Sequence, residues 1–315
     1  MSRPLRLKPF LSQRFEYEFY HIHPSLHLNY YMDYGTTFVK LGLRLARRDF
    51  DAVLVWNLYY LPLISAIEGF RKIVDITDVE RTITHSRWLK GVLVDAVERK
   101  WFGEADLSIC ADYGVYRKLT NSDTNLKVEY VPNGVDLQLF KPHPDVEIRY
   151  DACYLGKIER QYALESMVDG LAESDANCLF IGRGEDMEYY RSYASKAGAK
   201  VDFRGFVEYP RVPRTLCSCR MGLVPNVESA SLKLLEYLAC GLPVASPGTL
   251  DPALAEVVTP IKAAEGREYA EAVKRVRSMT PEDHSSLSKR CREAVLPFSL
   301  QATSSRYCDA IEAVI

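Results

Sequence analysis

Short apolar runs alternate with helix-like segments along the whole chain, and this alternation predicts the fold class. The runs that read as strands are residues 15–23, 51–56, 72–76, 107–110, 127–131, 150–155, 177–181, 201–203, 221–227 and 242–245. The helix-like segments are residues 30–48, 61–69, 88–102, 113–119, 189–197, 211–219, 231–240, 267–279 and 300–315. Strands that alternate with helices in this way are typical of mostly parallel, doubly wound sheets. The chain is therefore expected to be an α/β protein with two Rossmann-like domains.

One stretch, residues 228–245, combines a strand exit, a helix and a helix stop. A helix is expected to begin at Ser229 or Ser231 and to end at Gly241 in a left-handed cap. Free backbone N–H groups at such a helix start, with Lys233 in the first turn, form an anion site suited to a diphosphate. Glu236 lies on the same side and can accept hydrogen bonds from a sugar diol. On these residues alone, an ordinary helix with a solvated lysine and glutamate remains an equal alternative.

The composition is typical of soluble globular proteins, and the net charge gives no electrostatic attraction to nucleic acid. The 315 residues have room for two domains, and hydrophobic residues make up 47%, charged residues 26% and the net charge is -2. No apolar run reaches the length of a membrane span, and charges near the N-terminus interrupt any signal-peptide core, so a cytoplasmic protein is expected. The eight cysteines lack metal-site spacing, and free thiols are expected.

The string from Lys233 to Val244, together with Glu228 and Glu236, resembles the signature of retaining GT-B glycosyltransferases, the glycosyl transferases group 1 (family 4-like). The resemblance implies two Rossmann-like domains that face each other across a cleft, with a C-terminal helix that crosses back to the first domain. It also implies that Glu228 lies near the donor sugar, that Glu236 holds the ribose and that residues 231–233 bind the diphosphate.

Further motifs extend this resemblance over residues 127–315. The string from Pro132 to Asp136 resembles the point where the N-terminal domain passes to the C-terminal one, with expected bounds of 1–141 and 142–298 and a closing helix over 299–315. The resemblance implies a catalytic set of Glu228, Lys157 and Lys233. It implies donor contacts from Gly156, Arg160, Arg183, Gly205, Phe206, Val207, Ser231, Leu232 and Glu236. Taken alone, the glycine-containing turns among them are weak motifs.

The first half of the chain departs from the family pattern. No Gly-Gly loop occurs near the start, so the first domain is expected to have an abbreviated beginning. Thr77 stands where the family commonly has a histidine that contacts the donor sugar, and His85 follows eight residues later. A surface role for His85 is the simpler interpretation. These departures leave the acceptor and the level of activity open.

The implied reaction is metal-independent sugar transfer from a UDP-, GDP- or ADP-sugar to a glycan or lipid-linked glycan, without a cofactor. Retention in the family is explained by attack on the face that the leaving group vacates, so no enzymic nucleophile is assigned. Two alternatives stay open, a nucleotide-sugar 2-epimerase of the same fold and a non-catalytic donor-binding subunit. Peripheral membrane contact is suggested by basic residues 1–14 and by a basic, aromatic helix, and solvated surfaces explain the same residues equally well. That helix contains Arg87, Trp88, Lys90, Arg99, Lys100 and Trp101.

Overall fold

The computed structural model divides the chain into two compact units. Unit 1 comprises residues 1–132 and 304–315, and unit 2 comprises residues 133–303. The structure describes residues 3–17, 50–56, 64–65, 67–76, 102–122, 126–225, 231–247, 251–262 and 265–315. Each unit has a parallel sheet covered by helices, so the expected α/β class is confirmed.

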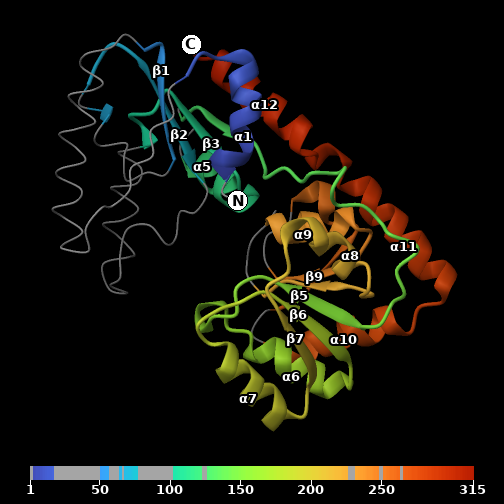
Figure 1. Ribbon diagram of the computed structural model, residues 1–315. Coiled ribbons are helices and arrows are strands. Elements are labelled where there is room, and N and C mark those ends of the chain that lie inside the picture. Colours follow the sequence, from blue (N-terminus) through green and yellow to red (C-terminus); the bar gives the residue numbers. More distant parts are fainter. Residues whose placement is uncertain are drawn as a thin grey trace. The chain divides into compact units, whose positions relative to one another are not determined.

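Unit 1 is built on a four-stranded parallel sheet with the order β1-β2-β3-β4 (Figure 1). Its strands are β1 (Ala52–Trp56), β2 (Arg71–Ile76), β3 (Leu107–Cys110) and β4 (Val128–Tyr130). They confirm four of the expected strands. Residues 15–17 of the expected first strand are not in a strand, and the rest of that segment lies outside the described residues.

Helices pack on both faces of this sheet, and the alternation of side chains along each strand explains why. Val55 and Val74 point to the face that Leu119 of α5 (Tyr113–Ser122) covers. The neighbouring residues Leu54 and Ile73 point to the opposite face. That face is covered by α1 (Arg3–Arg14) and by the C-terminal helix α12 (Leu300–Glu312). Both faces are therefore apolar, as a parallel sheet requires.

The N-terminal helix uses its apolar side inside unit 1. Leu7 and Leu11 are buried in the same cluster as Tyr307 and Ile311 of α12. Arg14 forms ion pairs with Asp309 and Glu312 of α12. The segment suggested as a membrane-touching edge or a frayed terminus is thus a packed helix. Within the described ranges, no helix combines the length and the apolar character needed to cross a bilayer.

Unit 2 is built on a six-stranded sheet with the order β10-β9-β8-β5-β6-β7. The strands are β5 (Ala152–Leu155), β6 (Asn177–Ile181), β7 (Lys200–Gly205), β8 (Gly222–Leu223), β9 (Val244–Ser246) and β10 (Val258–Pro260). The chain enters in the middle at β5, runs outward to β7, and returns to β8 on the other side of β5. The order therefore reverses between β5 and β8, and ligands of such sheets bind beyond the carboxyl ends of the strands at this point.

Helices cover both faces of the second sheet (Figure 1). On one face lie α6 (Glu165–Ser174), α7 (Met187–Ala197) and α10 (Gly266–Arg277). On the other lie α8 (Val212–Leu216), α9 (Leu232–Ala239) and α11 (Pro281–Ala294). Single 3-10 turns connect several elements: η2 (Arg160–Tyr162), η3 (Tyr209–Arg211), η4 (Pro252–Leu254) and η5 (Leu296–Phe298).

Several expectations about unit 2 are corrected by the structure. The strand expected over residues 242–245 begins at Val244, and the helix expected over 211–219 is a 3-10 turn followed by the short α8. Helices α6 and α11 and strand β10 have no counterpart among the sequence-based elements. Helix α11 buries only Cys291 completely, so its apolar periodicity is weak. Its start is nevertheless marked, because Thr280 accepts from the Asp283 N–H at 3.1 Å and a proline follows it.

Candidate functional site

Three glycines end adjacent strands at the carboxyl edge of the second sheet. Gly156 follows β5, Gly182 follows β6 and Gly205 ends β7. The Gly156 N–H donates to the Ile181 carbonyl at 3.0 Å, and the Gly182 N–H donates to the Gly205 carbonyl at 2.9 Å. A Cβ on Gly182, whose φ is +142°, would lie 1.8 Å from the carbonyl oxygen of Gly156. Only glycine lets these strand exits approach so closely, and they present backbone groups at one edge.

Helix α9 begins at the same edge, beside the strand-order reversal. Ser231 is its N-cap, and the Ser231 hydroxyl accepts from the Leu234 N–H at 3.4 Å. The helix ends in a Schellman motif, because Gly241 has φ +78° and the Leu242 N–H donates to the Tyr237 carbonyl at 3.0 Å. Both expected helix ends are therefore confirmed. The first N–H groups of a helix point out of its N-terminal end.

Tyr237 of α9 ties the helix to the two strands at the reversal. Its hydroxyl accepts from the Leu155 N–H at 2.5 Å and lies 3.5 Å from the Leu223 carbonyl. Burial raises the pKa of this phenol well above its ordinary value, so it stays protonated and can donate to that carbonyl. A Cβ on Gly222 would lie 2.4 Å from the Tyr237 ring, so β8 passes the ring only because it has glycine there.

Lys233 brings the helix start to the segment that follows β5. Its ammonium nitrogen lies 5.8 Å from the centre of the Tyr154 ring and 5.6 Å from that of Tyr162. Both distances are within the range of cation–π attraction, which holds the half-buried side chain over this segment. The lysine expected to bind a diphosphate thus lies beside the turn that carries Lys157.

The two other expected cations already have carboxylate neighbours. Lys157 is 66% exposed, and its ammonium group lies 3.6 Å from Glu159. Arg160 pairs with Asp186 at 3.4 Å, and its guanidinium stacks over the Tyr189 ring at 3.9 Å. Lys157 is therefore held loosely and can turn to an incoming anion, whereas Arg160 is held by two side chains on the flank of the segment.

Among the expected site residues that the structure describes, Glu236 has the most deeply buried charged side chain. It is 3% exposed, and its Oε1 accepts from the Tyr209 hydroxyl at 2.7 Å. Tyr209 belongs to η3, which follows β7, so this bond joins α9 to the exit of a strand on the far side of β5. Tyr209 was not among the residues expected from sequence. Its place four residues beyond the strand-ending Gly205 is the signal that marks it.

Arg183 and Phe206 meet although they follow different strands. The Arg183 guanidinium lies 4.7 Å from the centre of the Phe206 ring, and the ring is 61% exposed. Val207 packs partly against the core next to it. An exposed aromatic ring and a guanidinium plane at a strand edge form a surface on which a flat heterocycle can stack.

Part of the expected site lies outside the described residues. These are Glu228, Thr77, His85 and the basic, aromatic segment over residues 87–101. The structure therefore places Lys157 and Lys233 of the expected catalytic set, but not Glu228. All of the expected donor contacts are described, and each lies on α9 or its N-cap, at the end of β7, or on a segment that follows β5, β6 or β7. The aromatic supports Tyr154, Tyr162 and Tyr209 were missed from sequence.

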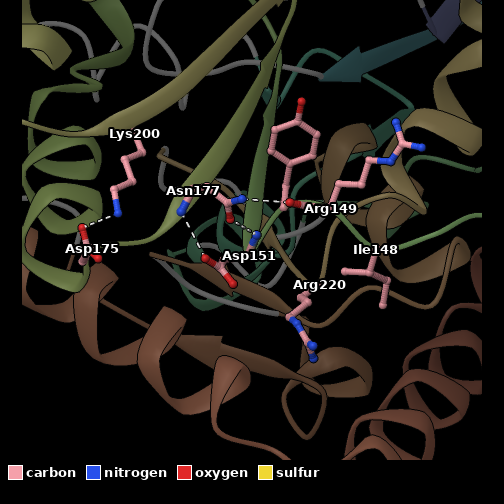
Figure 2. A pocket seen from close by; sticks show the side chains of 8 residues that line it. Ile148, Arg149, Asp151, Asp175, Asn177, Lys200 and Arg220 are labelled. Carbon is pink, nitrogen blue, oxygen red and sulfur yellow. Dashed lines mark hydrogen bonds and ion pairs between the residues drawn. The ribbon is translucent and has the colours of Figure 1, made fainter.

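A cavity of 420 Å³ lies at the opposite edge of the same sheet (Figure 2). Its lining residues precede or begin the strands: Ile148, Arg149, Tyr150, Asp151, Asp175, Asn177, Lys200 and Arg220. Figure 2 shows Lys200 turned toward Asp175, at 2.7 Å, and Asp151 turned toward Asn177. None of the expected site residues that the structure describes lines it. The candidate site described above lies instead at the carboxyl edge, where the strand order reverses.

The segment that contains this edge matches a known family. Residues 150–278 match the family model described as Glycosyl transferases group 1. All of the expected donor contacts lie within the matched range. A search of curated protein sequences finds no match to the chain.

Solved structures share the fold of both units. Sucrose-phosphate synthase from Thermosynechococcus elongatus has a TM-score of 0.79 at 16% identity, with 93% of this chain and 82% of that chain covered. Anabaena HepE in complex with UDP and glucose has a TM-score of 0.71 at 14% identity, with 97% and 89% covered. The apo lipopolysaccharide outer core galactosyltransferase WaaB has a TM-score of 0.68 at 15% identity, with 90% and 81% covered. The fold is therefore that of the GT-B glycosyltransferases.

Proposed function

We propose that this protein transfers a sugar from a nucleotide diphosphate sugar to an acceptor hydroxyl, with retention of the anomeric configuration. The observation that carries the proposal is the meeting of the α9 start with the segment after β5, where Lys233 lies over Tyr154 and Tyr162. An anion site and a buried carboxylate thereby occur on one helix at the strand-order reversal. A nucleotide diphosphate sugar has both groups that such a helix fits, a diphosphate and a ribose diol.

The diphosphate is proposed to bind between the α9 start and the Gly156 turn. Ser231, Leu232 and Lys233 form the helix start, and the exposed Lys157 faces the anion from the turn. Negative charge grows on the diphosphate as the bond to the sugar breaks. Fixed cations and N–H groups stabilise that charge without any reorganisation, which is usually the largest contribution to catalysis.

The nucleoside is proposed to lie across the exits of β6 and β7. Glu236 accepts hydrogen bonds from the ribose, and the base stacks at Arg183 and Phe206. Backbone groups of Gly205 and Val207 complete the contact with the base. Arg160 is proposed to support the segment near the phosphates rather than to grip them, because Asp186 and Tyr189 hold it.

Chemistry at the sugar is proposed to need no metal and no cofactor, because cations take the place of a metal at the diphosphate. Glu228 is proposed to position the donor sugar. The acceptor hydroxyl attacks from the face that the leaving group vacates, and the departing phosphate takes the proton. Undiminished turnover in excess EDTA is expected, and a complete loss that added Mg²⁺ or Mn²⁺ restores would contradict this point.

The proposed donor and acceptor classes follow the structural neighbours. HepE is described in complex with UDP-glucose, and WaaB as a lipopolysaccharide outer core galactosyltransferase. We therefore propose a UDP-sugar as the first donor to test and a glycan or lipid-linked glycan as the acceptor. Peripheral contact with the cytoplasmic face of a membrane is part of this proposal, and liposome binding by the intact protein tests it.

The deciding experiment incubates the protein with UDP-, GDP- and ADP-sugars in the presence and absence of glycan acceptors. Acceptor-dependent release of the nucleoside diphosphate, with an α-linked donor giving an α-linked product, is the expected result. Conversion of the donor sugar without any acceptor would show a 2-epimerase instead. Donor binding by calorimetry without conversion in any mixture would show a donor-binding subunit.

A further inference from the structure

The hydrogen bond between Tyr209 and Glu236 is the feature of the site that the proposed roles leave unused. It joins the hydroxyl of Tyr209, a residue that is 44% exposed, to the carboxylate of Glu236, which is only 3% exposed. The two residues are 27 positions apart in sequence and lie on different elements. Such a short bond to a buried charge fixes the position of the carboxylate group.

Tyr209 is itself held in place by its surroundings. Its ring lies 5.3 Å, centre to centre, from the ring of Phe140, which is fully buried. Its carbonyl accepts from the Val212 N–H, which closes the 3-10 turn. A salt bridge between Glu208 and Arg211, at 3.3 Å, spans the same turn. The phenol therefore approaches Glu236 from a fixed direction.

A neutral donor suits a carboxylate that must bind a further hydroxyl. A carboxylate can accept about four hydrogen bonds, so the bond from Tyr209 is compatible with additional donors. A lysine or arginine in the same place would neutralise the charge and weaken its attraction for a sugar hydroxyl. A phenol orients the carboxylate and leaves its negative charge intact.

We propose that Tyr209 is a positioning residue that orients Glu236 toward the ribose diol and so makes the site selective for ribonucleotides. This inference rests on the proposed function, because it needs Glu236 to bind a ribose. It goes beyond that function in assigning the selectivity between ribose and its deoxy forms to a residue on the β7 exit. Tyr209 acts through Glu236 and needs no contact with the reacting atoms.

The test measures calorimetric dissociation constants for UDP, GDP and ADP and then for the 2′,3′-dideoxy form of the tightest binder. Wild-type protein is expected to prefer the ribonucleotide. Tyr209→Phe removes the hydroxyl alone and is expected to weaken ribonucleotide binding about tenfold. Binding of the dideoxy form is expected to change by less than about twofold, because it lacks the hydroxyls that Glu236 accepts from.

Tyr193→Phe is the matched control. The Tyr193 hydroxyl donates to Asp169 at 2.9 Å, so the change also removes a phenol–carboxylate bond, but between α7 and α6. It is expected to leave both dissociation constants as in the wild type. A second arm introduces Tyr209→Phe into Glu236→Gln, where it should have little further effect on the ribonucleotide. This double variant still tests the positioning role if Tyr209→Phe alone lowers the melting temperature.

The outcomes separate the inference from the function on which it rests. Equal weakening of both ligands by Tyr209→Phe, or an unchanged preference for the ribonucleotide, would overturn the positioning role while the proposed function stands. Tighter ribonucleotide binding would overturn it as well, because the phenol would then compete with the ribose. Wild-type protein that binds none of the three diphosphates would overturn the proposed function and the inference together.

Discussion

The guanidinium of Arg292 donates to the carbonyl oxygen of Ala239 at 2.8 Å, at the C-terminal end of helix α9. The same side chain donates to Phe140 at 2.6 Å and to Leu137 at 2.9 Å. One arginine of α11 thereby joins the connector before β5 to the helix that carries Lys233 and Glu236. Its positive charge also suits the negative end of the α9 dipole, and burial lowers the pKa of the guanidinium.

Replacing Arg292 is expected to destabilise unit 2. Arg292→Met leaves carbonyl groups without their charged donor and should lower the free energy of unfolding by roughly 2–4 kcal/mol. Urea unfolding followed by circular dichroism at 222 nm measures the change. All three tryptophans, Trp56, Trp88 and Trp101, belong to residues 1–132, so tryptophan fluorescence follows unit 1 separately.

The matched control for this prediction is Arg290→Met, two residues earlier on α11. Arg290 is exposed and donates to one carbonyl, that of Glu256, at 3.3 Å. The control is expected to change stability by less than about 0.5 kcal/mol. Equal losses in the two variants would show that the three bonds of Arg292 do not stabilise the unit.

Lys233→Ala and Glu236→Ala are each expected to abolish donor turnover and to leave the fold intact. Lys233 is proposed to supply charge at the diphosphate, and Glu236 is proposed to bind the ribose. Nucleoside diphosphate release from the donor panel is the measurement, and circular dichroism checks the fold. Lys196→Ala, at an exposed position on α7, is the control and should turn over donor as the wild type does. Near-wild-type turnover in either site variant would refute the site assignment.

Substitutions at two glycines with positive φ separate the free-energy cost of backbone strain from that of a steric clash. Gly198 has φ +73° and nothing within 4 Å of an added Cβ, so Gly198→Ala should cost about 1–2 kcal/mol. In Gly182→Ala the new Cβ would meet the Gly156 carbonyl, and the loss should exceed about 3 kcal/mol. Urea unfolding compares them. Similar losses of stability in the two variants would mean that the ends of β5 and β6 can move apart without a further cost in free energy.

Cys217 is expected to be the most reactive thiol of the eight. It is partly accessible, whereas the other seven cysteines are buried. A hydrogen bond from the Cys240 thiol lowers the pKa of Cys217, so its thiolate forms at a lower pH than that of an ordinary cysteine. Brief iodoacetamide treatment at a series of pH values, followed by peptide mass spectrometry, should show Cys217 modified first.

The cause of this reactivity is testable in the same assay. Cys240→Ala removes the donor and should shift the pH profile of Cys217 alkylation upward, toward that of a free cysteine. Cys291→Ala removes another buried thiol of unit 2 and serves as the control. An unshifted profile in Cys240→Ala would exclude the thiol–thiol bond as the cause.

Local features of the chain could be predicted because their physical causes lie within a few residues. Ser231 caps α9 and Gly241 ends it, as the sequence indicates, since capping and positive φ depend on adjacent backbone. Apart from β10, the described strands of both sheets follow from short apolar runs. Helix α11 was missed because its face buries little, although Thr280 and Pro281 mark its beginning.

Contacts between residues far apart in the chain could not be predicted from the sequence. Arg183 meets Phe206, and Tyr209 meets Glu236, only because β6, β7 and α9 reach one edge of a sheet whose order reverses at β5. Arg160 was expected to contact the donor, and only the structure shows Asp186 and Tyr189 against it.

The sequence by itself determined the fold class, the bounds of most strands and the helix that is proposed to carry the anion site. These depend on periodicity, caps and glycine, which act locally. The tertiary structure alone decided which side chains share the site and which donors orient Glu236. Those contacts depend on strand order and on the packing of elements far apart in the chain, and no spacing of residues encodes them.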